Sequence, residues 1–194
     1  MSKKRLSVVD LLVSREFRVL SDLENRMVVA GSGTWDCTFN HFATYLANQG
    51  FFIDKSDLIF GYCAYYGISI SNLENSGGVE YGLFGSFITA TYQISMDQID
   101  HSTISSFTSS HVMSIQLDNS GIGHTVTPLE VVTGELKDRF GNEKDGNHVK
   151  YYDPLAGGIY YVHEDDIKGF FLYEILDYCL LGQYFGAGAG YHGY

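Results

Sequence analysis

The sequence predicts an α+β protein in which N-terminal helices pack on an antiparallel β-sheet. Apolar residues recur at helical spacing in the first half of the chain, whereas short strand-like runs separated by turn residues follow from His111 onward. Helices that precede a group of consecutive strands are typical of the α+β class. A chain of 194 residues is expected to form one domain. We assign that domain to residues 32–182, between an N-terminal helical segment (1–31) and a Gly/Tyr-rich tail (183–194).

The first half of the domain is expected to be helical, with polar residues marking the ends of the elements. Ser56 is a plausible N-cap, Gly67 ends the same helix, and Gly50 lies just past the end of the preceding one. Residues 72–78 are expected to form a polar loop. The predicted helices span residues 6–29, 38–48, 56–66, 81–92 and 96–107.

The second half is expected to supply the sheet. Turn-forming residues separate the runs at 118–123 and 153–158, and a charged loop is expected over residues 135–146. The acidic stretch that begins at His163 is expected to open a last helix. The predicted strands span residues 111–117, 124–133, 147–152 and 159–162.

Composition narrows the function classes. The hydrophobic fraction of 45%, with 13 Phe and 15 Tyr, is ample for a buried core. The net charge of −11 argues against nucleic acid or an anionic membrane as partner. No apolar run is long enough to predict a transmembrane segment, and the basic start lacks the apolar core of a standard secretory signal.

The three cysteines do not form a disulfide framework. Cys63 and Cys179 lie in apolar segments and are expected to be inert core thiols, and neither has the spacing of a zinc site. Cys37 differs, because it opens an amphipathic helix. The positive end of the helix dipole favours a thiolate there, which makes Cys37 a candidate nucleophile.

A cysteine nucleophile needs a base, and the base needs a group that fixes its tautomer. His124 opens one predicted strand and Asp153 follows the end of the next, so an antiparallel ladder can bring them together. Cys37, His124 and Asp153 are therefore the candidate catalytic residues. His111 is the rival base but lies one strand earlier, and His41, one turn after Cys37, is taken as a surface or core residue.

Other readings of these residues stay open. Asp36 is expected to cap the helix that Cys37 begins, with its side chain accepting amides of the first turn. Its charge would oppose thiolate formation, so it is not expected to activate Cys37. Trp35 is expected to pack or to line a substrate groove. Cys37 could instead be a core cysteine, His124 a hydrogen-bonded strand residue, and Asp153 the start of a turn at Pro154.

The segment from Cys37 to about Phe170 resembles a papain-like cysteine peptidase, most of all the family that cleaves double-glycine leaders from bacteriocins. Asp36-Cys37 before an amphipathic helix resembles the nucleophile motif, Gly123-His124-Thr125-Val126 resembles the segment around the base, and Tyr152-Asp153-Pro154 resembles the third member. The resemblance implies a papain-like fold, a peptide or protein substrate, and hydrolysis through an acyl-enzyme without a metal or organic cofactor. It leaves the oligomeric state open.

The sequence departs from that family at the oxyanion hole. The family usually has a glutamine about six residues before the cysteine, where this chain has Gly31. Loss of one such donor typically costs on the order of 100- to 1000-fold in turnover. The backbone amide of Cys37 can contribute, and Ser32 or Thr34 is a candidate substitute.

The N-terminal segment suggests a second idea. Residues 20–33 resemble the double-glycine-type leader of exported bacterial peptides, with Ala30-Gly31 or Gly31-Ser32 as the cut. The protein is accordingly expected to be either cytoplasmic or exported through such a leader. The simpler interpretation is an N-terminal helix packed on the domain.

The sequence therefore leads to one principal hypothesis and two alternatives. The principal hypothesis is a thiol peptidase that uses Cys37, His124 and Asp153. The alternatives are an exported, catalytically degenerate binding module or effector, and an acyl transferase that uses the same triad.

Overall fold

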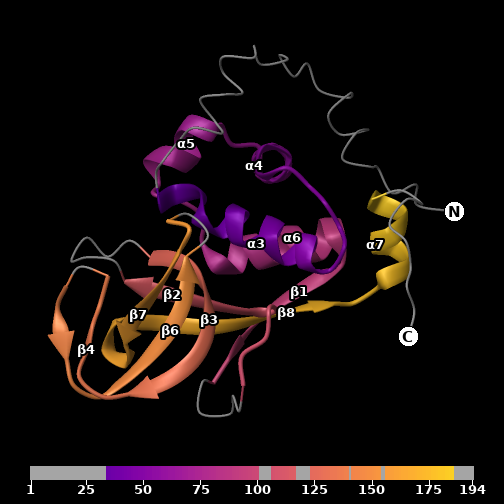
Figure 1. Ribbon diagram of the computed structural model, residues 1–194. Coiled ribbons are helices and arrows are strands. Elements are labelled where there is room, and N and C mark those ends of the chain that lie inside the picture. Colours follow the sequence, from indigo (N-terminus) through magenta and orange to yellow (C-terminus); the bar gives the residue numbers. More distant parts are fainter. Residues whose placement is uncertain (1–33, 101–105, 117–122, 140, 154–155, 186–194) are drawn as a thin grey trace, which may run out of the picture.

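The computed structural model describes residues 34–100, 106–116, 123–139, 141–153 and 156–185 (Figure 1). The predicted helix 6–29 therefore lies outside the described residues. The helical elements are η1 (Thr34–Asp36), α3 (Cys37–Asn48), α4 (Lys55–Tyr66), α5 (Ile70–Asn75), α6 (Tyr81–Tyr92), η3 (Glu164–Asp166) and α7 (Tyr178–Phe185). The strands are β1 (Ile94–Ile99), β2 (His111–Gln116), β3 (Gly123–Thr133), β4 (Leu136–Lys137), β5 (Glu143–Lys144), β6 (Asn147–Asp153), β7 (Gly158–His163) and β8 (Ile167–Ile175).

A six-stranded antiparallel sheet, in the order β1-β8-β2-β3-β6-β7, forms one layer, and α3 to α6 form the other (Figure 1). This arrangement confirms the predicted helices on an antiparallel sheet. β4 and β5 form a separate two-stranded hairpin within the segment that connects β3 to β6. Residues 135–146, predicted to be a loop, therefore contain a short hairpin.

α3, α4 and α6 form where the sequence predicted helices. Phe39, Phe42 and Leu46 are fully buried, which turns one face of α3 toward the core. Gly67 ends α4 with φ of 67°, a left-handed conformation that favours glycine. The predicted N-cap of α4 is wrong, because Asp54 occupies that position and Ser56 lies inside the helix.

The sheet is buried on both faces at its centre. Val112 and Tyr173 pack with the helices in one aromatic-rich core, whereas Met113, Ile115 and Phe170 belong to a second core on the opposite face. β2 is consequently buried at four consecutive positions instead of at alternate ones. Because both faces are covered, the beginning of β3 is withdrawn from solvent, and this is where the candidate base lies.

Three predicted segments differ from the structure. Residues 72–78 were expected to be a loop, but α5 occupies 70–75, with the Ser69 hydroxyl accepting the Asn72 N–H. The predicted helix 96–107 is wrong, because β1 occupies 94–99 and pairs with β8 from Ile94 opposite Ile175. The helix expected to begin at His163 is a single 3-10 turn, η3, followed by β8. Long-range pairing of β1 with β8 overrides the local pattern in both cases.

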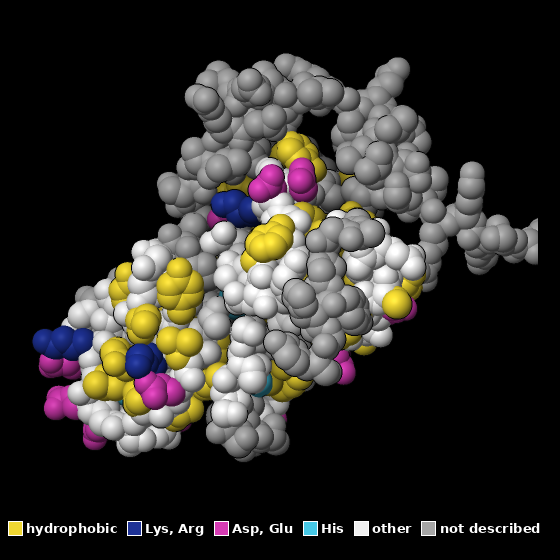
Figure 2. All heavy atoms as spheres, turned by 45° about the vertical axis from the view of Figure 1, so that its right-hand side comes forward, with side chains coloured by type: hydrophobic (Ala, Val, Ile, Leu, Met, Phe, Trp, Pro, Cys, Tyr) yellow, Lys and Arg dark blue, Asp and Glu magenta, His cyan; other side chains and the backbone are white. Residues whose placement is uncertain are grey.

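β3, β6 and β7 carry exposed hydrophobic side chains. Leu129 and Val131 of β3, Tyr152 of β6 and Ile159 of β7 are all exposed. Leu129 lies at an irregularity in the β3–β6 register, which leaves it without a partner across the ladder. Figure 2 shows hydrophobic side chains gathered around lysine and acidic side chains on the sheet part of the molecule. In the described part of the chain, none of the helices has both the length and the apolarity that a membrane span requires.

Candidate active site

Cys37 is the first residue of α3 and is only 5% exposed. Its Sγ accepts the backbone N–H of Thr125 at 3.3 Å, which joins the start of α3 to the start of β3. Burial acts to raise the pKa of the Cys37 thiol, but the proximity and charge of His124 and the hydrogen bond from Thr125 outweigh it. The pKa of Cys37 is therefore lowered, as a nucleophilic thiol requires.

His124 and Asp153 meet through the sheet. Thr127 of β3 stands opposite Tyr152 of β6, so continuing the register places Val126 opposite Asp153. His124 lies on the same face of β3 as Val126 and is diagonal to Asp153. The two side chains are each 1% exposed, and His124 Nε2 lies 2.9 Å from Asp153 Oδ2. The structure thus brings together the base and the carboxylate that the sequence singled out.

The electrostatics of His124 favour its charged form. Burial acts to lower the pKa of His124, but the hydrogen bond to Asp153, the proximity of Cys37 and the charges of both groups raise it to about 9. Since Nε2 faces Asp153, Nδ1 is the nitrogen left for Cys37. Nδ1 is buried and makes no hydrogen bond of good geometry among the described residues. Catalytic hydrogen bonds are often long or poorly aligned before substrate binds.

Asp153 has a second cationic partner that the sequence did not suggest. Arg139 Nη1 lies 2.6 Å from Asp153 Oδ2, the oxygen that also faces His124. The other carboxylate oxygen, Oδ1, accepts the backbone N–H of Ala156 at 3.1 Å. Arg139 lies in the segment between β4 and β5, and no local motif in the sequence connects it with Asp153.

A chain of three hydroxyl groups borders Cys37. Thr125 Oγ1 lies 2.8 Å from Thr38 Oγ1 and 2.7 Å from the hydroxyl of Tyr81. The Tyr81 ring stacks on Phe171 with a centroid distance of 4.4 Å, and burial raises the pKa of Tyr81 to about 12. Tyr81 is therefore a neutral hydrogen-bonding group at neutral pH. Sequence analysis missed it, because a tyrosine at the start of a predicted helix carries no distinctive signal.

Asp36 has a different role from the predicted N-cap. It precedes α3, but its side chain makes no capping hydrogen bond. Asp36 is instead fully buried, and its Oδ2 pairs with Lys55 Nζ at 2.6 Å. Lys55 comes from the start of α4, so this ion pair ties the starts of the two helices together beside Cys37 and offsets the negative charge there.

The other two histidines considered in the sequence analysis, His41 and His111, do not belong to the His124–Asp153 pair. His41 is a core residue, with Nε2 2.9 Å from Thr127 Oγ1. Burial, and then the charge of His124, lower the pKa of His41 to about 3. His111 begins β2 and its Nδ1 accepts the backbone N–H of Thr108 at 2.9 Å.

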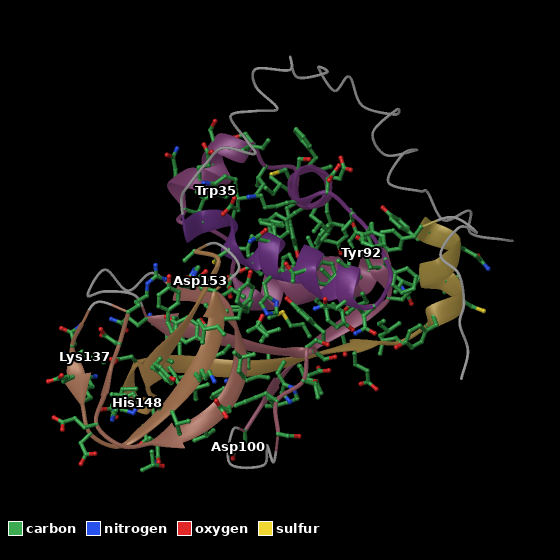
Figure 3. All side chains as sticks on the ribbon, viewed as in Figure 1. Trp35, Tyr92, Asp100, Lys137, His148 and Asp153 are labelled. Atoms are coloured by element: carbon green, nitrogen blue, oxygen red, sulfur yellow. The ribbon has the colours of Figure 1, made fainter. Side chains whose placement is uncertain are left out.

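A cavity of about 670 Å³ opens on Cys37. It lies between the start of α3, the segment that leads into α6, the second half of β2, the start of β3 and part of β8. Trp35 lines it, as the sequence allowed, and Figure 3 shows Trp35 in the helical layer with Asp153 below it at the end of β6. Gly78 approaches so closely that an added Cβ would lie 2.8 Å from the Trp35 carbonyl oxygen. The apolar and aromatic lining consists of Trp35, Tyr62, Ile68, Leu73, Val79, Tyr81, Leu83 and Phe171.

The structure does not describe the side chains of the two residues predicted to replace the glutamine of the oxyanion hole. Ser32 lies outside the described residues, and Thr34 belongs to η1 without a described side chain. The hydroxyl groups of Thr38, Tyr81 and Thr125, together with that of Ser114, are described polar groups that line the cavity with Cys37.

The remaining cysteines separate into two kinds. Cys63 is buried, as predicted, and burial raises its pKa to about 11. The prediction of a core thiol is wrong for Cys179, which is exposed on α7. α7 packs only partly on the helical layer, so an apolar stretch did not mean a buried cysteine there.

Within the described ranges, His, Cys, Asp and Glu side chains form no cluster of three or more that could hold a metal ion. Comparisons of the chain with protein-family models, curated proteins and solved structures give no match.

Proposed function

We propose that this protein is a papain-like thiol hydrolase that cleaves a peptide bond through an acyl-enzyme. The observation that carries the proposal is the connected arrangement of a thiol with a lowered pKa, a histidine with a raised one, and a buried carboxylate 2.9 Å from that histidine. A neutral core cysteine would have its pKa raised, as Cys63 has. The sheet-on-helix layout and the Cys, His, Asp order support the papain-like assignment.

Each residue of the triad has a defined task in this reaction. Cys37 Sγ, as a thiolate, attacks the carbonyl carbon, and the C–N bond breaks as imidazolium His124 gives its proton to the leaving amine. His124 then takes a proton from water, which attacks the thioester carbonyl. The C–S bond breaks, the carboxylic acid is released, and the Cys37 thiolate and imidazolium His124 are regenerated. Asp153 holds the imidazole by Nε2 and stabilises its charge throughout.

The cavity beside Cys37 supports a peptide as substrate. Its lining combines apolar side chains with the backbone of residues 76–78, and such a mixture suits an extended chain with a large apolar side chain. Cys37 is nearly buried, so a substrate reaches Sγ through this cavity. The backbone N–H of Cys37 at the start of α3 is one oxyanion donor, and a hydroxyl of the cavity wall takes the place of the missing glutamine.

The experiment that tests the proposal is labelling with a peptidyl vinyl sulfone and mapping of the modified cysteine by mass spectrometry. We expect Cys37 to be modified, and the Cys37→Ser and His124→Ala variants to lose the modification. Cys179→Ser is the matched control, because Cys179 is exposed and away from the triad. Labelling confined to Cys179 would contradict the proposal and would favour a catalytically degenerate binding module.

Peptide turnover distinguishes hydrolysis from acyl transfer. Unlabelled protein is incubated with a peptide mixture, with and without an added primary amine, because the vinyl sulfone blocks Cys37. Free carboxylic acid as the main product in both cases supports a peptidase. An amide formed with the added amine as the main product would instead identify an acyl transferase on the same triad.

A further inference from the structure

We propose that Arg139 is a positioning residue of the reaction, reaching from the β4–β5 hairpin to share one oxygen of Asp153 with His124 and thereby limiting how strongly that carboxylate holds the imidazolium. The inference rests on the proposed function, because it assigns Arg139 a task in the same triad. It adds a residue that lies outside the motifs of the sequence.

The first step is the geometry at Asp153 Oδ2. Arg139 Nη1 lies 2.6 Å and His124 Nε2 lies 2.9 Å from this one oxygen. Two cationic donors therefore compete for the same acceptor. A guanidinium is permanently charged, so Arg139 withdraws part of the negative charge that would otherwise stabilise imidazolium His124.

The second step is that the hairpin holds Arg139 in place. Asp138 closes the turn, because its Oδ1 accepts the Asn142 backbone N–H at 2.9 Å and its Oδ2 accepts the Asn142 side-chain amide at 2.7 Å. At the other end of the hairpin, Lys144 Nζ bonds Asp166 Oδ2 at 2.8 Å. The guanidinium also lies over the Tyr160 ring, 5.2 Å from its centroid. An arginine bound at both the carboxylate and a ring is fixed in direction.

The third step is the charge balance of the buried site. With the thiolate and imidazolium formed, Cys37 and Asp153 are negative and His124 and Arg139 are positive, so the group is neutral. Without Arg139 it would carry one net negative charge, which favours every protonated form. Among the described residues, the titratable and charged groups that face this site include Cys37 and His41 from α3, Tyr81 from α6, His124 from β3, Arg139 from the hairpin, Tyr151 and Asp153 from β6, Tyr160 from β7, Tyr173 from β8, and the Asp36–Lys55 ion pair beside Cys37.

The test is the pH profile of Cys37 alkylation by iodoacetate, followed residue by residue with mass spectrometry on the full chain. The carboxylate of this reagent is attracted by imidazolium His124, so the rate depends on the imidazolium as well as on the thiolate. The reactive ion pair disappears at high pH as imidazolium His124 loses its proton. We expect Arg139→Gln to move this alkaline limb to higher pH by on the order of one unit, since a repelling cation is removed. Arg139→Lys keeps the charge and is expected to restore the wild-type profile.

Lys137→Gln is the matched control. Lys137 lies in the same hairpin and the change removes the same charge, but its partner is the exposed Glu143 at 2.9 Å, and Figure 3 shows it on the outer side, away from Asp153. We expect its profile to match the wild type. Thermal unfolding of each variant, followed by circular dichroism, establishes that it is folded at the assay temperature.

Two results would overturn the inference while leaving the proposed function intact: an Arg139→Gln profile identical to the wild type, or a limb displaced to lower pH. The second would mean that His124 had lost the carboxylate. If the alkylation profile of Cys37 in the wild-type protein shows no alkaline limb, the proposed function is overturned, and the inference with it. Titration of His124 by nuclear magnetic resonance in Cys37→Ser and in Cys37→Ser/Arg139→Gln measures the change in the pKa of His124 directly. This measurement does not depend on the reactivity of a thiol.

Discussion

The backbone N–H of Thr125 donates to Cys37 Sγ over 3.3 Å, although the two residues lie in a strand and a helix far apart in the sequence. This contact sets the distance between the start of α3 and the start of β3. The residue before Thr125 is His124, whose side chain leaves the opposite face of β3 toward Asp153. One short stretch of β3, His124 and Thr125, therefore contacts both the thiol and the carboxylate.

Asp153→Asn is expected to weaken the ion pair. The carboxylate is a principal cause of the raised pKa of about 9 at His124, so its loss moves the alkaline limb of Cys37 alkylation down toward pH 6.5. Peptide hydrolysis is expected to fall by up to about 10,000-fold, because an amide also favours the wrong tautomer. The measurement is the alkylation profile together with kcat/KM.

Glu130→Gln is the control for that change. Glu130 pairs with Lys150 at 2.6 Å on the surface, so the same loss of charge occurs away from the triad. An Asp153→Asn profile that coincides with that of Glu130→Gln would show that Asp153 does not act on His124.

Thr125→Val is expected to destabilise the fold by about 1–3 kcal/mol, because it leaves the hydroxyls of Thr38 and Tyr81 without their shared partner in a buried site. The additional change Thr38→Val should cost less in this background than alone, since one orphaned hydroxyl is then removed. Urea unfolding measures both. Thr133→Val, at an exposed Thr133–Asn147 contact of 3.0 Å, should have little effect.

Lys55→Met is expected to destabilise the protein by about 3–5 kcal/mol, because it leaves the fully buried Asp36 carboxylate unpaired. The double variant Asp36→Asn/Lys55→Met should recover part of that loss. The free energy of unfolding in urea is the measurement. Lys150→Met breaks an exposed pair with Glu130 and should change the free energy of unfolding little. Equal losses of stability in Lys55→Met and Lys150→Met would refute the stabilising role of the buried ion pair.

His41 is expected to make the protein sensitive to acid. Its pKa in the folded state is about 3, below the ordinary value of 6.5, so the unfolded chain takes up the proton first as pH falls. The stability that depends on neutral His41 is complete above pH 6.5 and is lost toward pH 3, by on the order of 5 kcal/mol. His41→Gln should flatten the fall in melting temperature over that range.

The control for the acid experiment is His111→Gln. His111 is only partly buried, and its pKa is lowered less, so its replacement should change the pH dependence less than that of His41 does. Parallel curves for wild type and His41→Gln between pH 6.5 and 3 would mean that His41 is not the acid-sensitive group.

The sequence determined those features that depend on near neighbours. The periodicity of Phe39, Phe42 and Leu46 was enough to predict α3 with Cys37 at its start, because one helical face can be recognised from local spacing. The ranges of β2, β3, β6 and β7 followed from strand runs between turn residues. His124 and Asp153 could be paired in advance because antiparallel neighbours place the start of one strand near the end of the next.

Only the tertiary structure decided the contacts that cross between elements. β1 and β8 were taken for helices because their pairing joins residues about 80 positions apart, as in Ile94 opposite Ile175. The partners of the acidic residues were equally hidden: Lys55 reaches Asp36 from another helix, and Arg139 reaches Asp153 from a hairpin. Local spacing fixes which face of an element is apolar, whereas the choice of ionic partner depends on the distance between elements after they pack. The residues that carry the proposed chemistry could therefore be identified from the sequence, but the groups that set their charge could not.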